Sequence, residues 1–279
     1  MSTPRQSPLF HAEQADRYSR QDLIIEYQNS FECRLVVLID LIFPQSMSLF
    51  EELIYDASPD QDLHLLLATP GGDGETAVRL IRSAQARCRE LTIMVPDQAK
   101  SAGTIMCLGA HHIGMGPTSD LGPVDPQFQM PNGNLVSAKS IIAAVKSAEE
   151  AVQNHPESFP IHASLLSGVD ALLLEAAKAA MSRGAELVQD ALRSNPARSA
   201  DEAVAIADKL KQQLIDTPSS HAAIFGADDA DAIGLPVLKL DPQSPQWRLI
   251  WRLWAKYLVT GERWYEGERC SKSLGQRPF

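Results

Sequence analysis

The feature that most constrains the fold is a series of short apolar runs, each followed by a segment with helical periodicity. The runs are RLVVLIDL at 34–41, LHLLLATP at 63–70 and LTIMVP at 91–96. Their length and aliphatic content are typical of buried β-strands. Strands that alternate with helices at this spacing favour parallel pairing through right-handed crossovers. The sequence therefore predicts an α/β fold with a mostly parallel sheet.

Helices are predicted between these strands and through the second half of the chain. After Pro44, apolar residues recur at helical spacing, and a second apolar stripe runs from Ala77 to Cys88. Ser199 and Glu202 lie three residues apart, the spacing of a capping box at a helix start. The other predicted elements are helices over 101–109, 169–194 and 199–214, a helix with Ile141 and Val152 on one face, a short helix ending at Gly234, and strands over 111–115 and 236–240.

The composition excludes several classes of protein. The chain has 279 residues, 44% hydrophobic and 22% charged, which excludes a disordered or low-complexity protein. A formal net charge of −10 without a Lys/Arg run argues against nucleic-acid binding. No apolar run reaches the roughly 18 residues of a membrane span and no signal pattern is present, so we expect a soluble, cytoplasmic protein. The spacing of the four cysteines predicts buried free thiols, and no metal site or cofactor is indicated.

Three segments are predicted along the chain. Residues 1–30 are polar and aperiodic, and we expect an arm that is ordered only by docking. Residues 31–240 carry the α/β pattern, and residues 241–279 form a helical, tryptophan-rich C-terminal extension.

The helix of this extension has an apolar stripe. Trp247, Trp251 and Trp254 share one of its faces. Such a stripe is most often part of a core, and otherwise a contact with another subunit or protein partner, or a membrane-surface helix.

A glycine-rich turn, TPGGDG at 69–74, lies directly between a predicted strand and a helix. One interpretation is a tight turn, because glycine adopts positive φ without steric cost. The other is an anion site, because consecutive glycines at a helix start expose backbone N–H groups. The spacing does not match the glycine patterns of nucleotide-binding loops.

Ser101 follows the third predicted strand and begins a helix. Serine at such a position is usually a helix cap. An exposed hydroxyl beside a free helix N–H is also the combination that a nucleophile and an oxyanion donor require. Both this turn and TPGGDG lie at carboxyl ends of adjacent strands, where α/β sheets place their sites.

A nucleophilic serine needs a base, and the sequence leaves two kinds open. His111, His112 and His221 are the histidine candidates, each more often structural than catalytic. Lys139 begins a predicted helix beside an apolar face, and a lysine can act as a base when it is neutral. Lys100 adjoins the serine but is expected to point elsewhere.

Together these segments resemble the ClpP/crotonase superfamily, and most of all the serine dehydrogenase proteinase and signal peptide peptidase A group of serine peptidases. The likeness lies in TPGGDGETAVRLIRSA (69–84), VPDQAKSAGTIMCLGAHHIGMGPTSDLGPVDPQF (95–128) and, more weakly, SHAAIFGADDADAIGLPV (220–237). The pairing of KSAGT with DLGPVDPQ is its most specific part. The resemblance implies a ClpP/crotonase-like fold of repeated β-β-α units, a peptide or protein substrate and a homo-oligomer.

The resemblance also implies roles for individual residues. Ser101 corresponds to the nucleophile, and Gly72 and Ala102, with Gly71 beside them, correspond to the oxyanion hole. Lys139 matches the general base of Ser-Lys relatives, and His221 is the second candidate.

Some of the family pattern is absent. The histidine of ClpP is replaced by the segment 125–127, so a Ser-His-Asp triad is not carried over. His111 and His112 stand where many members have an acidic pair.

Two other functions share this fold. A crotonase-like enzyme would hold an acyl-CoA thioester with the same N–H pair, but such sites usually recruit carboxylates, and Ser101 argues against it. A scaffold could also retain the fold without activity, or require a partner for it, because fold does not determine function.

Overall fold

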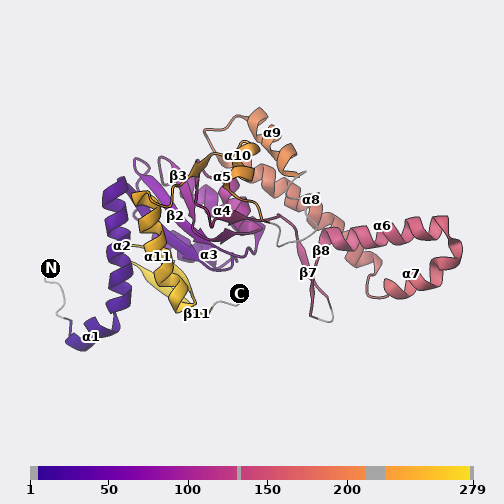
Figure 1. Cartoon of the computed structure of the whole chain (residues 1–279), viewed down its shortest axis with the longest axis horizontal. Coiled ribbons are helices and arrows are strands. Elements are labelled where there is room, and N and C mark those ends of the chain that lie inside the picture. Colours follow the sequence, from indigo (N-terminus) through magenta and orange to yellow (C-terminus); the bar gives the residue numbers. More distant parts are fainter. Residues whose placement is uncertain (1–5, 131–132, 212–223, 277–279) are drawn as a thin grey trace.

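The computed structural model describes residues 6–130, 133–211 and 224–276, and its centre is a seven-stranded sheet (Figure 1). The strands lie in the order β11-β10-β1-β2-β3-β5-β9. The parallel part consists of β1 (Cys33–Ile39), β2 (Asp62–Ala68), β3 (Leu91–Val95), β5 (His112–Met115) and β9 (Val237–Lys239). The apolar runs predict the first three of these strands, and the strands predicted over 111–115 and 236–240 are the other two, so the expectation of a mostly parallel α/β sheet is confirmed.

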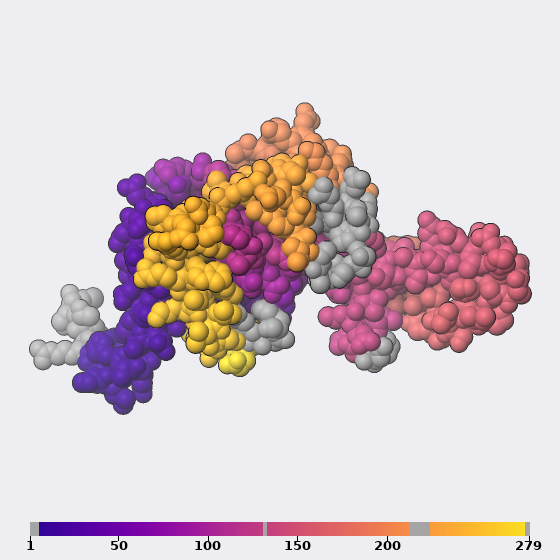
Figure 2. All heavy atoms as spheres, viewed as in Figure 1, coloured from indigo at the N-terminus to yellow at the C-terminus, as the bar shows by residue number. Residues whose placement is uncertain are grey.

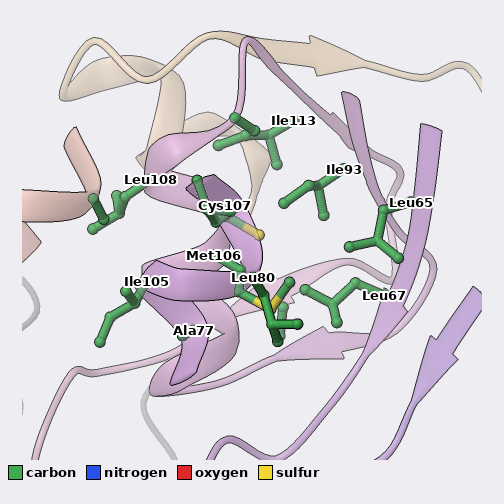
Figure 3. Packing of buried hydrophobic residues seen from close by; sticks show 14 of the residues in the cluster. Leu65, Leu67, Ala77, Leu80, Ile93, Ile105, Met106, Cys107, Leu108 and Ile113 are labelled. Atoms are coloured by element: carbon green, nitrogen blue, oxygen red, sulfur yellow. The ribbon is translucent and has the colours of Figure 1, made fainter. Parts of the chain in front are cut away.

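Helices cover both faces of the sheet and divide the core in two. On one face lie α3 (Ser46–Leu53), α4 (Gly74–Gln85), α5 (Ala102–Gly109) and the second half of α8 (Ala171–Ser194); on the other lie α2 (Ala15–Phe31) and α11 (Pro245–Thr260). Figure 3 shows the first core, where Leu65, Leu67 and Ile93 of the strands face the side chains of α4 and α5. Because the central strands are buried on both faces, their sequences are continuous apolar runs.

Polar side chains cap the N-termini of two helices. The Asp73 carboxylate accepts a hydrogen bond from the Thr76 N–H at 2.8 Å and so caps α4. The capping box predicted at Ser199 and Glu202 begins α9 (Ala200–Leu210). Residues 212–214, to which that helix was expected to extend, lie outside the described residues.

The N-terminal segment differs from the expectation of an aperiodic arm. It forms α1 (Pro8–Glu13) and α2, and α2 packs beside α11 (Figure 1). The buried side of α2 combines Leu23, Ile24 and Tyr27 with the polar side chains Arg20 and Gln21. These buried polar residues weaken the apolar periodicity, which is why the sequence pattern did not reveal the helix.

The C-terminal segment is also more than a helical extension. After α11 the chain forms β10 (Glu262–Glu266) and β11 (Ser271–Gln276), and β10 pairs antiparallel with β1. Residues 262–276 thus complete the central sheet. The strands are short and half polar because they lie towards the edge of the sheet, so they lack the apolar runs of the central strands.

The tryptophan stripe of α11 is mainly core. Trp247 is 5% exposed and Trp254 is 3% exposed, and both belong to the cluster between α2, α11 and the sheet. Trp251 is 40% exposed and stacks on Trp247 with ring centroids 6.2 Å apart. The core interpretation is therefore confirmed for two of these three residues.

A helical arm projects from the body of the molecule (Figures 1 and 2). It contains α6 (Ala138–Asn154), the 3-10 turn Pro156–Ser158, α7 (Phe159–Leu165) and the first half of α8, and the hairpin of β7 (Gln127–Gln129) and β8 (Leu135–Ser137) lies at its base. The second half of α8 returns to pack on α4 and α5.

Three short elements complete the described structure. These are β4 (Gln98–Ala99), which pairs with β6 (Asp120–Leu121), and α10 (Ala227–Ala232). Across the described ranges, no helix combines the length and the apolar character that crossing a membrane requires.

Candidate active site

Ser101 lies at the junction between β4 and α5 in a strained backbone conformation. Its φ is 50° and its ψ is −110°, a region that costs a residue with a Cβ on the order of 1–3 kcal/mol. The side chain makes no capping hydrogen bond to α5, although serine in this position usually does. The structure therefore does not support the helix-cap interpretation, and strain of this kind is characteristic of serine nucleophiles at strand-to-helix turns.

Gly71 lies directly against Ser101. A Cβ added to Gly71 would be 2.8 Å from the Ser101 Cβ and 3.4 Å from its Oγ. The φ of Gly71 is +120°, which a side chain would also disfavour. The two turns singled out from the sequence are thus brought together at the carboxyl ends of their strands, as predicted.

Ile42 makes two backbone hydrogen bonds with the turn that contains the Gly71–Gly72 peptide. The Ile42 N–H donates to the Gly71 carbonyl oxygen at 2.8 Å, and the Ile42 carbonyl accepts from the Asp73 N–H at 2.7 Å. Since a trans peptide points its N–H opposite to its C=O, the Gly72 N–H is directed away from Ile42. Residues 98–101 run on that side, because Thr69 bridges to Ala99 there.

The N-terminus of α5 adds a second N–H group. Ala102 is the first residue of this helix, and the first N–H groups of a helix have no intrahelical acceptor. The Ser101 carbonyl accepts the first helical hydrogen bond, from the Ile105 N–H at 3.0 Å. A hydroxyl and a helix-terminal N–H are therefore adjacent in the chain, and the partial positive charge of the terminus favours an anion.

Contacts between KSAGT and DLGP explain why these motifs occur together. The Lys100 ammonium pairs with the Asp120 carboxylate and donates to the Leu121 carbonyl at 3.3 Å. The Thr104 hydroxyl donates to the Gly122 carbonyl at 2.8 Å and accepts from the Gly122 N–H at 3.1 Å. The second motif thus anchors the turn that carries Ser101, and the Lys100 ammonium contacts Asp120 and Leu121 of this motif.

Lys139 is the second residue of α6 and is half-buried. The N-terminus of this helix is fixed by Ser137, whose hydroxyl accepts from the Ser140 N–H at 3.0 Å. The Ala138 N–H donates to the Pro126 carbonyl at 2.8 Å. The base of α6 therefore lies beside the 125–127 segment.

The other candidate bases have different surroundings. His221 lies outside the described residues. The His111 Nδ1 accepts from the Leu91 N–H at 3.0 Å, and burial lowers the pKa of this ring. The His112 Nε2 lies 3.4 Å from the Glu90 carboxylate at the surface. His111 and His112 thus have structural surroundings at the opposite end of β3 and β5 from Ser101.

Sequence analysis missed two residues that shape the site. The buried Thr69 hydroxyl accepts from the Gly71 N–H at 3.0 Å, and its methyl group fills the space beside Gly103. Asp40 follows β1 and is fully buried. A polar residue directly after a buried apolar strand was the available signal in both cases.

The segment that contains this site is similar to a known protein family. Residues 46–159, which include both glycines of the turn, Ser101 and Lys139, match one protein family. That family is the ClpP-like SDH-type serine proteinases. The predicted resemblance is thereby confirmed, and the SDH-type segment contains the strained serine.

Relatives extend the comparison without adding a known activity. Two uncharacterized proteins of Methanocaldococcus jannaschii are 35% and 30% identical over 95 and 80 residues, or 34% and 28% of this chain. These matches span 33% and 27% of the length of the two relatives.

Two solved structures of the 1510-N membrane-bound stomatin-specific protease are similar in outline. One is a serine-to-alanine mutant, with 15% identity, a TM-score of 0.47, and coverage of 82% of this chain and 85% of the other. The second is a lysine-to-alanine mutant in complex with a substrate peptide, with 14% identity, a TM-score of 0.47, and coverage of 88% and 87%.

Proposed function

We propose that this protein is a serine peptidase in which Ser101 attacks a peptide carbonyl. The observation that carries the proposal is the strained, non-capping Ser101 beside the Gly71–Gly72 turn, within a segment that matches serine proteinases. A serine held out of its helix cap keeps its hydroxyl available for chemistry. The reaction is acyl transfer, with an acyl-enzyme on Ser101 that water then hydrolyses.

The Gly72 and Ala102 N–H groups form the oxyanion hole of the proposed reaction. Support comes from the Gly72 N–H, which is directed away from Ile42, and from the position of Ala102 at the start of α5. Two such donors stabilise the negative charge that develops on the carbonyl oxygen in the tetrahedral intermediate, and loss of one typically lowers turnover about a hundredfold or more.

Lys139 is the general base in this proposal, so the pair is a Ser-Lys dyad. The neutral amine accepts the Ser101 proton as the hydroxyl attacks, and the resulting ammonium returns the proton to the leaving amine. Its place at the fixed start of α6, beside the segment that replaces the ClpP histidine, supports this role. His221 is the alternative base.

The decisive experiment compares four forms of the protein on a peptide library and a disordered protein, with products identified by mass spectrometry. The forms are the wild type, Ser101→Ala, Lys139→Ala and Lys146→Ala. Lys146 is the matched control, because it lies on the same helix, and its side chain is 75% exposed and pairs with Glu150.

We expect the wild type and Lys146→Ala to cleave, and Ser101→Ala and Lys139→Ala not to cleave. If Lys139→Ala still cleaves while Ser101→Ala does not, the base is His221. If the wild type cleaves nothing, the peptidase proposal is replaced by a partner-dependent or non-catalytic protein. A rise in melting temperature with a CoA thioester would instead favour the crotonase-like alternative.

Assembly is the remaining part of the proposal. We expect a homo-oligomer, and we expect the exposed part of α11 at Trp251 to contact a partner protein. Sedimentation of the wild type and of Trp251→Ala measures both, since loss of a stacked, exposed indole removes contact area without opening the core.

A further inference from the structure

The chain between β1 and α3, residues 40–46, forms one wall of the Gly71–Gly72 turn. Ile42 makes hydrogen bonds on both sides of Gly72, to the Gly71 carbonyl and from the Asp73 N–H. A Cβ on Gly72 would lie 2.0 Å from the Ile42 carbonyl oxygen, so the two backbones are in direct contact. The position of Ile42 therefore sets the direction of the Gly72 N–H.

Asp40 holds the first end of this segment. Its side chain is fully buried, and Oδ1 accepts a hydrogen bond from the Leu41 N–H at 2.7 Å. The Arg263 guanidinium of β10 lies 3.8 Å away, across the β1–β10 pairing. One oxygen of the carboxylate is therefore held by its own backbone and attracted by the Arg263 cation, while Oδ2 has no hydrogen-bond partner among the described residues.

Tyr265 of the same strand holds the second end. Its hydroxyl is 2.7 Å from the Ser46 Oγ, and that oxygen accepts from the Phe43 N–H at 3.1 Å. Arg263 and Tyr265 are two residues apart, so they project from the same face of β10. One face of one strand thus contacts both ends of the segment that carries Ile42.

We propose that β10 is a positioning strand for the oxyanion site: Arg263 and Tyr265 hold residues 40–46 so that Ile42 aligns the Gly72 N–H with Ser101. This inference rests on the proposed peptidase function. It assigns a role to residues 241–279, which lie outside the segment that matches the serine proteinases. Arg263 and Tyr265 are positioning residues, because they act on Gly72 only through the backbone of Ile42.

The charge of Asp40 makes this arrangement sensitive to pH. Burial raises the pKa of Asp40 to about 6, while the Leu41 N–H and Arg263 oppose the increase. Among the described residues, Arg263 and the Tyr265 phenol of β10 are the charged and titratable groups that interact with it. Attraction to Arg263 exists only when Asp40 is ionised, so the alignment is expected to change as the carboxyl is protonated.

The test observes the Gly72 amide directly. Gly71–Gly72 is the sole Gly-Gly pair in the sequence, so protein labelled with ¹³C-carbonyl, ¹⁵N-glycine gives a single HNCO peak, from the Gly72 N–H. The shift of this peak is followed from about pH 5 to about pH 8 in the wild type, Asp40→Asn and Arg263→Gln. Arg269→Gln is the control, because Arg269 is 75% exposed and pairs with Asp56 at the surface.

We expect the wild-type peak to shift with a midpoint near pH 6, the value of the Asp40 carboxyl. Arg263→Gln should move the midpoint to higher pH, Asp40→Asn should abolish the step, and Arg269→Gln should behave like the wild type. A Gly72 peak without a step in this range, or an unchanged midpoint in Arg263→Gln, overturns the proposal. Neither outcome depends on peptidase activity, so failure of the proposed function is recognised separately.

Kinetics provide a second measurement once a cleaved peptide is known. Tyr265→Phe removes the hydroxyl that meets Ser46 and retains the ring. It is expected to lower kcat about tenfold with KM little changed, because the interaction it loosens acts in the transition state. A rise in KM alone would contradict a positioning role.

Discussion

The Cα of Gly71 faces the Cβ of Ser101 so closely that a methyl group on the glycine would be 2.8 Å from it. Gly71→Ala is therefore expected to displace Ser101 and to lower peptidase turnover about a hundredfold, the effect of disturbing an oxyanion site. The control is Gly133→Ala, since Gly133 also has a positive φ, +84°, but no atom lies near its added Cβ. Equal losses in both variants would mean that backbone strain, not proximity to Ser101, causes the effect.

The anchor between the two motifs predicts a stability change. Asp120→Ala leaves the largely buried Lys100 ammonium without its carboxylate and the Phe225 N–H without an acceptor that now lies at 2.8 Å. We expect a loss of about 3 kcal/mol in the free energy of unfolding, as for other broken buried pairs. Urea unfolding measures it, and Glu175→Ala, which breaks the exposed pair with Lys178, should change it by less than about 1 kcal/mol.

A buried carboxylate connects β10 with the helices α2 and α11. The Glu266 carboxylate accepts from the Arg20 Nε at 2.7 Å and from the Tyr257 hydroxyl at 2.6 Å, so it links β10, α2 and α11. Removal of the Glu266 carboxylate leaves the groups that donate to it buried without this acceptor. We therefore expect Glu266→Ala to lower the free energy of unfolding by about 3–5 kcal/mol. Thermal unfolding is the measurement. A melting temperature like that of Glu26→Ala, which breaks the exposed pair with Arg252, would show that this cluster contributes little.

His64 makes stability depend on pH. Burial lowers its pKa from 6.5 to about 4, and its Nδ1 lies 2.7 Å from the Tyr27 hydroxyl. The unfolded chain therefore binds a proton at this site first, so the contribution of His64 to the free energy of unfolding falls as pH decreases from 6.5 to about 4, by on the order of 3 kcal/mol in total. Asp40, whose pKa is raised to about 6, contributes with the opposite sign in this range, so the effect of His64 is measured as a difference between variants.

The difference in free energy of unfolding between the wild type and His64→Asn should therefore fall as pH decreases from 6.5 to about 4, whereas the difference between the wild type and His155→Asn, at an exposed position, should stay constant. A difference between the wild type and His64→Asn that does not change with pH in this range would contradict a neutral, buried His64.

How well the sequence predicted each element of the fold depended on how that element is buried. The central strands are buried on both faces, so their apolar runs were sufficient to predict them and their parallel order. In α2 the buried face contains Arg20 and Gln21, whose partners lie at the far end of the sequence, and no local pattern reveals such pairs. The same holds for β10, whose place in the sheet depends on β1.

The candidate site divides in a similar way. Ser101 and the glycines were recognisable because the proposed chemistry and the backbone geometry favour those residue types at those turns. Asp40 and Thr69 support the site through contacts with Arg263 and Gly71. A buried polar residue after a strand indicates such support without identifying its partner. The partner becomes visible only when the strands are assembled.

The pairing of β1 with β10 has a consequence for biosynthesis. A ribosome delivers β1 long before β10, so the nascent sheet has an open edge beside residues 40–46 until β10 has been made. Contacts between such distant segments form late in folding. The wall that orients Gly72 is therefore completed only after β10 has been made, and a polypeptide that lacks β10 lacks the contacts proposed to align the oxyanion site.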